Sequence, residues 1–109
     1  MKIKRVASVI GIKTENIARY EELHAQVWPD VLNRLQKSHV HNYSIYRYEN
    51  TLFSYLEYTG DDYQSDMEDI AADPITQDWW SLCIPLQVPM EDRNHGEWWM
   101  ELPEIFHLD

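Results

Sequence analysis

The chain has 109 residues, of which 44% are hydrophobic, so it is long enough for one domain with a core of modest size. Its formal net charge of −10 would repel nucleic-acid phosphates and anionic lipids, which makes small neutral molecules and other proteins the better candidate partners. Cys83 is the only cysteine, and no apolar run approaches the roughly 18 residues of a membrane span. We therefore expect one cytoplasmic domain over residues 1–109, without an internal disulfide and without nucleic-acid or membrane partners.

The first third of the chain predicts a strand followed by a helix. Residues 3–12 are rich in β-branched side chains, which strands favour, and Thr14 is the expected N-cap of the next helix. At about 100° per residue, one helix face then collects side chains that are apolar or aromatic apart from one histidine. These are Ile17, Tyr20, His24, Val27, Trp28, Val31 and Leu35. Pro29 lies inside this pattern, so it must either kink the helix or begin a second one.

The rest of the chain predicts a hairpin, two more helical segments and a last strand. In order these are strands at 41–48 and 51–58, helices at about 61–72 and 74–86, a polar loop at 88–97 and a short strand within 100–108. The order strand–helix–strand–strand–helix–strand is typical of the α+β class, specifically a ferredoxin-like antiparallel sheet with its helices on one face. The other face would carry Asn42, Ser44, Tyr46 and Tyr48, and we expect it to meet a second subunit in a homodimer.

The stretch "YEELHAQVWP" at residues 20–29 contains the first candidate for chemistry. Tyr20 and His24 are four residues apart, so their side chains are neighbours on one helix face. Imidazole titrates near neutral pH and can give or take a proton, and a phenol can hydrogen-bond a substrate hydroxyl. The competing interpretation is a core histidine that donates to a carbonyl group.

Two tryptophan pairs are candidates for sugar contacts. In Trp79-Trp80, adjacent helical residues point about 100° apart, so one indole can pack while the other lines a cavity. An indole face suits the C–H side of a sugar ring, and its N–H can reach a hydroxyl. Trp98-Trp99 lies beside the predicted loop and poses the same alternative between packing and binding.

The sequence argues against a metal site, a nucleotide cofactor and a cysteine nucleophile. His39 and His41 could share a strand face as metal ligands, but no motif supplies a third ligand, so no metal site is expected. The chain has only three glycines and contains no phosphate-binding loop or dinucleotide motif, which argues against nucleotide cofactors. Cys83 lies within an apolar helix, so we interpret it as a packing residue rather than a nucleophile.

Several motifs in order resemble the L-rhamnose mutarotase family over nearly the whole chain. They are Y-x3-H-x3-W-P, H-N-Y-S-I-Y, L-F-x-Y-x-E, the pair W-W and the C-terminal E-I-F-H-L-D. The resemblance implies a dimeric ferredoxin-like isomerase that interconverts the α and β anomers of L-rhamnose without a metal or cofactor. It further implies the site residues. His24 matches the family's proton donor, Tyr20 and Tyr43 match substrate-binding tyrosines, and Trp79 and Trp80 match the sugar-contacting pair.

The sequence leaves open both the sugar and the type of function. Residues 88–100, "VPMEDRNHGEWWM", do not fit the rhamnose pattern, which leaves L-fucose as a second candidate sugar. Trp98, Trp99 and His95 are the candidate residues for selection between the two sugars. Ferredoxin-like dimers also include haem-binding and aromatic oxygenases, and a sugar-binding module without catalysis would use the same tryptophans.

Overall fold

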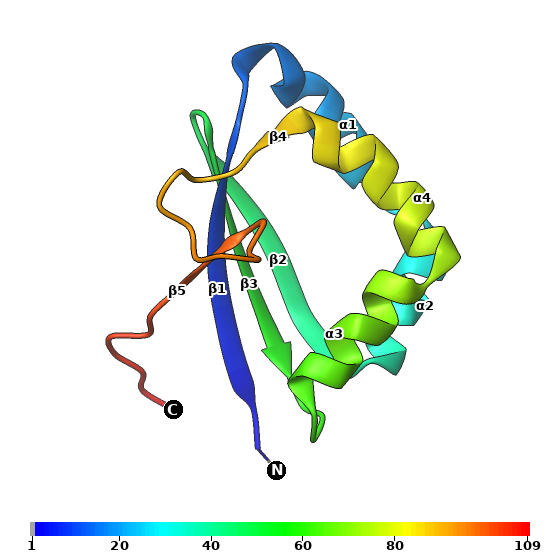
Figure 1. Ribbon diagram of the computed structural model, residues 1–109, viewed down its shortest axis with the longest axis vertical. Helices are drawn as coiled ribbons and strands as arrows, with labels where there is room; N and C mark the ends of the chain where they lie inside the picture. Colours follow the sequence, from blue (N-terminus) through cyan, green and yellow to red (C-terminus); the bar gives the residue numbers. More distant parts are fainter. Residues whose placement is uncertain (1) are drawn as a thin grey trace.

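The computed structural model describes residues 2–109, in which one antiparallel sheet is covered on one face by helices (Figure 1). The strands are β1 (Lys4–Ile12), β2 (Val40–Tyr48), β3 (Thr51–Tyr58), β4 (Gln87–Val88) and β5 (Met100–Leu102). The helices are α1 (Ile17–Ala25), α2 (Pro29–Lys37), α3 (Tyr63–Ala72) and α4 (Pro74–Cys83). The strand order is β2-β3-β1-β4, and β5 also pairs with β1. This topology confirms the predicted ferredoxin-like α+β class.

The core lies between the sheet and the helices. Residue alternation along β1 turns Val6, Ile10 and Ile12 toward the helices, and all three are buried. Ile10 is directly opposite Leu52 of β3, and these two side chains are 0% and 1% exposed. Burial of this apolar face therefore fixes how β1 and β3 align.

Two predicted helix boundaries needed correction. Thr14 is not the N-cap of α1, because residues Thr14–Asn16 form a short 3₁₀ turn and α1 begins at Ile17. The Thr14 hydroxyl instead accepts a hydrogen bond from the Asn50 side chain at 3.0 Å, so a contact with the β2–β3 turn takes its capping oxygen. The helix predicted at 74–86 ends at Cys83, and a 3₁₀ turn follows it.

Pro29 begins a second helix, α2, and does not kink the first one, which decides the alternative left open by the sequence.

A bulge in β2 matters for the site. His41 pairs with Glu57 and Ser44 pairs with Tyr55, so two residues of β2 stand opposite the single residue between those partners. One of the two, Asn42, has a φ of 48°, and its side chain donates to Glu57 at 2.7 Å. Asparagine tolerates this left-handed backbone better than most residues. The extra residue lets Tyr43 turn toward the helices.

The sheet face away from the helices stays partly uncovered. Tyr46 and Tyr48 of β2 are 66% and 68% exposed, as the alternation predicted. The C-terminal segment leaves the body of the fold after β5 (Figure 1), and its Ile105, Phe106 and Leu108 are exposed.

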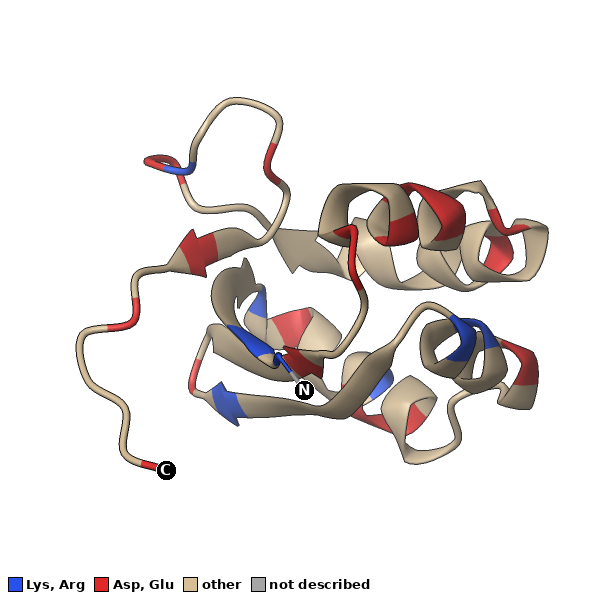
Figure 2. Ribbon diagram, turned by 90° about the horizontal axis from the view of Figure 1, so that it is seen from below, with Lys and Arg blue, Asp and Glu red and all other residues tan. Residues whose placement is uncertain are grey.

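Charge is spread over the surface. Asp and Glu outnumber Lys and Arg by 19 to 9, and Figure 2 shows acidic positions on the helices, on the loops and along the terminal segment. Among residues 2–109, no helix is both long and apolar enough to cross a membrane.

Candidate active site

A cavity of about 280 Å³ brings together all five predicted site residues. Its lining comes from α1, β2, α4 and the segment that follows α4. The lining residues are Tyr20, His24, Tyr43, Ile45, Trp79, Trp80, Cys83, Ile84, Gln87, Trp98 and Trp99. A second, more apolar cavity of about 410 Å³ adjoins it and shares His24, Tyr43, Ile45, Trp79 and Trp80. Such a largely apolar hollow with a few convergent polar groups is the usual form of a small-molecule site.

His24 has one ring nitrogen engaged and one available. Its Nδ1 lies 2.8 Å from the backbone carbonyl oxygen of Tyr20. A carbonyl oxygen can only accept, so Nδ1 carries the proton and Nε2 of the neutral ring is a free acceptor. His24 thus makes the carbonyl contact expected of a core histidine, and its second ring nitrogen is still available for chemistry. Desolvation lowers the His24 pKa below its usual value, against the smaller opposing effect of the carbonyl bond.

Aromatic rings surround this imidazole. Tyr20 stacks on His24 with ring centroids 4.1 Å apart, and Trp79 meets His24 edge-on at 5.3 Å. Trp28 in turn packs edge-on against Trp79 at 5.2 Å. Trp79 is 5% exposed and Trp80 is 36% exposed, so one indole is held in the core while its neighbour presents more surface.

The phenol of Tyr20 lies at the end of a hydrogen-bonded chain that the sequence did not predict. Gln87 Nε2 lies 3.2 Å from Tyr20 Oη, and Trp98 Nε1 lies 2.8 Å from Gln87 Oε1. Burial raises the pKa of Tyr20 well above its ordinary value, so the phenol stays protonated at neutral pH. No periodicity or motif distinguishes Gln87 in the sequence, because its role depends on contacts with residues 67 and 11 positions away.

Tyr43 enters the same cavity from the sheet. The bulge at Asn42 and Tyr43 gives it the orientation of Ile45, which also lines the cavity. Desolvation raises the pKa of the Tyr43 phenol to about 12, although 43% of the residue is exposed. Its hydroxyl is therefore a neutral hydrogen-bonding group in this site.

The loop before β5 contributes two of the three candidate residues for sugar selection. Trp98 and Trp99 line the cavity, whereas His95 is exposed and does not. Arg93 holds the loop by donating to the carbonyl oxygens of Met90 and Glu97, each at 2.9 Å. The Arg93 guanidinium also lies 6.0 Å from the centre of the Trp98 ring.

The Cys83 thiol and the possible metal ligands are the remaining candidates for chemistry. Cys83 is buried, and desolvation raises the pKa of its thiol to about 11, which leaves little thiolate at neutral pH. Within residues 2–109, no three His, Cys, Asp or Glu side chains are grouped closely enough to hold a metal ion.

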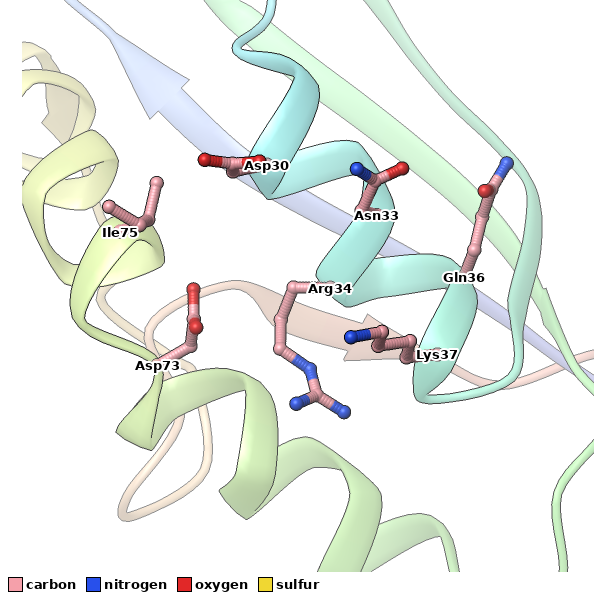
Figure 3. Close-up of a pocket in the computed structure, with 7 residues that line it drawn as sticks. All are labelled: Asp30, Asn33, Arg34, Gln36, Lys37, Asp73 and Ile75. Atoms are coloured by element: carbon pink, nitrogen blue, oxygen red, sulfur yellow. The ribbon is translucent and has the colours of Figure 1, made fainter.

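A separate polar cleft lies outside the core between α2 and the junction of α3 and α4. It is lined by Asp30, Asn33, Arg34, Gln36, Lys37, Asp73 and Ile75. Figure 3 shows Arg34 extending from α2 into the space between these helices, with Asp73 on the opposite side. The cleft has no aromatic ring and no histidine, so the cavity around His24 is the better candidate for sugar chemistry.

Comparison with known proteins shows which family this chain resembles over its length. A profile of the family described as L-rhamnose mutarotase matches residues 5–108. The L-rhamnose mutarotase of Phocaeicola vulgatus is 32% identical over 98% of this chain and 100% of its own length. That of Oceanobacillus iheyensis is 29% identical over the same shares.

Solved structures agree on the fold. A crystal structure of an L-rhamnose mutarotase from Formosa agariphila superposes with a TM-score of 0.76 at 25% identity, covering 97% of this chain and 99% of that one. The tetracenomycin F2 cyclase of Streptomyces glaucescens superposes with a TM-score of 0.72 at 12% identity, covering 97% of both chains. At that identity, the cyclase is informative about architecture only.

Proposed function

This chain belongs to the L-rhamnose mutarotase family, and on that premise we propose that it interconverts the α and β anomers of L-rhamnose in the cavity around His24. The observation that carries the proposal is the free Nε2 of His24, an acceptor at the edge of an aromatic cavity. It is an isomerase activity, and we propose that it needs no cofactor because one acid/base group can balance the reaction.

His24 moves a single proton in this proposal. Nε2 takes the proton from the anomeric hydroxyl O1, the C1–O5 bond breaks and a C1=O1 double bond forms. The resulting imidazolium gives the same proton to O5, so the open aldehyde is neutral overall. Rotation about C1–C2 presents the other face of the aldehyde, and the reverse steps close the ring to the second anomer. The lowered pKa of His24 supports the starting state, since the neutral ring is the form that can accept.

The other predicted residues bind the sugar. Tyr20 and Tyr43 are neutral phenols that can hydrogen-bond its hydroxyls. Trp79 and Trp80 offer indole surface to its C–H groups. The adjoining apolar cavity, lined in part by Val31, suits the 6-methyl group of a 6-deoxy sugar.

We further propose that two copies of the chain form a homodimer through the uncovered sheet face. Tyr46, Tyr48 and Phe53 are exposed on that face, and a second copy would remove their apolar surface from water. Replacement of Tyr46 by Asp should lower the mass measured by light scattering toward 13.1 kDa. A wild-type mass of one chain would refute the dimer.

We also propose a cytoplasmic location, which is consistent with the single cysteine.

Exchange between anomeric proton signals in NMR tests the function. L-rhamnose, L-fucose and D-glucose are each measured with wild type, with His24→Ala and without protein. Faster exchange of L-rhamnose, lost in His24→Ala, supports the proposal. Faster exchange of L-fucose alone would transfer the activity to that sugar. No acceleration for any sugar would refute the mutarotase proposal.

A further inference from the structure

The chain of hydrogen bonds from Trp98 through Gln87 to Tyr20 has a defined direction. The indole nitrogen of Trp98 can only donate, so the Gln87 atom 2.8 Å from it must be the amide oxygen. The amide of a glutamine has its oxygen on one side and its NH₂ group on the other. The group that faces Tyr20 Oη at 3.2 Å is therefore the NH₂ group, which donates.

This direction decides what Tyr20 offers to a ligand. Its hydroxyl oxygen accepts the hydrogen bond from Gln87, so the hydroxyl proton is not used in that contact. Both Tyr20 and Gln87 line the cavity, and the proton of a buried hydroxyl needs an acceptor there. Tyr20 is thereby set as a hydrogen-bond donor toward whatever occupies the cavity.

The neighbouring His24 is set in the opposite sense. Its Nδ1 is engaged by the Tyr20 carbonyl, so its Nε2 is an acceptor, and the two rings stack at 4.1 Å. One donor and one acceptor thus stand side by side. A cyclic hemiacetal has the complementary pair, since its anomeric O1–H donates and its ring oxygen O5 accepts.

We propose that Gln87, oriented by the Trp98 indole, is a positioning residue that fixes Tyr20 as the hydrogen-bond donor to the sugar ring oxygen. The proposal rests on the mutarotase function above. When the C1–O5 bond breaks, negative charge develops on O5, and a donor already aimed at that atom stabilises it without rearrangement. The Arg93 contacts that hold the loop keep Trp98 in place for this task.

Two substitutions alter the direction of this chain, and Gln87→Glu does so with almost no change of shape. In Gln87→Glu, a carboxylate accepts from both neighbours, so the Tyr20 hydroxyl proton turns to the carboxylate and away from the sugar. In Trp98→Phe, the amide loses the donor that orients it and can adopt both orientations. Tyr20→Phe removes the donor altogether. Gln64→Glu on exposed α3 is the control for an added negative charge, with the wild-type rate expected.

The measurement is kcat and KM for L-rhamnose anomer exchange in these variants and in the double variant Gln87→Glu with Tyr20→Phe. We expect kcat to fall about 10²-fold in Gln87→Glu and in Tyr20→Phe, the usual size for one donor to a developing oxyanion. The double variant should be no slower than Tyr20→Phe alone. Trp98→Phe should lie between wild type and Gln87→Glu.

The pH dependence of Gln87→Glu gives a second readout that a purely structural role would not change. A protonated carboxyl, like the amide, has one acceptor and one donor oxygen. The ratio of the Gln87→Glu rate to the wild-type rate should therefore rise as the pH is lowered. Effects of Gln87→Glu and Tyr20→Phe that multiply, or a constant ratio with pH, would refute the positioning role in an active enzyme. A wild-type protein that exchanges no anomer would instead refute the mutarotase function itself.

Discussion

The imidazole of His24 stacks on the phenol of Tyr20, with ring centroids 4.1 Å apart and ring planes inclined by 24°. The two residues are one helical turn apart in α1, and the backbone carbonyl of Tyr20 also accepts from His24 Nδ1. One helical turn therefore fixes both the orientation of the imidazole and the nitrogen that carries its proton. The proposed acid/base group is oriented by the helix that contains it.

His24→Asn should abolish most of the proposed activity. Asparagine retains polarity but cannot exchange a proton near neutral pH, and positioned proton transfer is worth about 10²–10⁴-fold. The anomer exchange rate per enzyme is the measurement. His95→Ala is the matched control, because that histidine is exposed and outside the cavity. Retention of more than half the wild-type rate in His24→Asn would remove His24 from the mechanism.

The anomer exchange rate should fall at acidic pH, with a midpoint below the ordinary histidine pKa of 6.5. Desolvation lowers the His24 pKa below 6.5, so Nε2 stays free until the pH drops beneath that value. Below the lowered pKa, both ring nitrogens carry protons and O1 can no longer be deprotonated. A profile of kcat/KM against pH checks this prediction. An acid limb centred above 6.5 would contradict the desolvated environment.

The same shift predicts how stability depends on pH. The unfolded chain takes up a proton on His24 at a higher pH than the folded chain does, so folding is favoured more strongly above pH 6.5. Lowering the pH through 6.5 and below should therefore lower the thermal denaturation midpoint of wild type more than that of His24→Asn. Equal acid sensitivity in the two proteins would show that His24 has the same pKa when folded and unfolded.

Tyr43→Phe should weaken sugar binding more than it slows the chemistry. Loss of one neutral hydrogen bond in a binding site is worth about 0.5–1.5 kcal/mol, so KM should rise about two- to tenfold. A kcat close to that of wild type is expected, because Tyr43 is proposed to bind and not to move a proton. Tyr48→Phe is the control, since that side chain lies on the sheet face away from the helices and does not line the cavity. A large drop in kcat with unchanged KM would give Tyr43 a different role.

Ile10→Ala should destabilise the fold by about 2–5 kcal/mol, the usual cost of a large-to-small change in a core. Ile10 is fully buried opposite Leu52, where β1 and β3 meet under the helices. Urea unfolding measures the loss. Ile75→Ala serves for comparison because that residue is 38% exposed and should change stability little. Equal losses in the two variants would argue against this core.

Local sequence patterns were sufficient for most elements. The β-branched run before Thr14 predicted β1, and Pro74 predicted the beginning of α4. The order of strands and helices gave the ferredoxin-like topology, since few arrangements bury one face of each element. The prediction of Thr14 as an N-cap was wrong for a non-local reason, because the side chain of Asn50, 36 residues away, donates a hydrogen bond to the Thr14 hydroxyl.

The sequence by itself determined most of the elements, their order and the neighbourhood of Tyr20 and His24, because each of these follows from spacing along one helix or strand. Only the tertiary structure decided that Gln87 reaches Tyr20 and that Trp98 orients Gln87. It also decided, through the bulge in β2, that Tyr43 faces the cavity. These features depend on where distant segments meet, and hydrogen bonds between distant segments leave no period in the sequence.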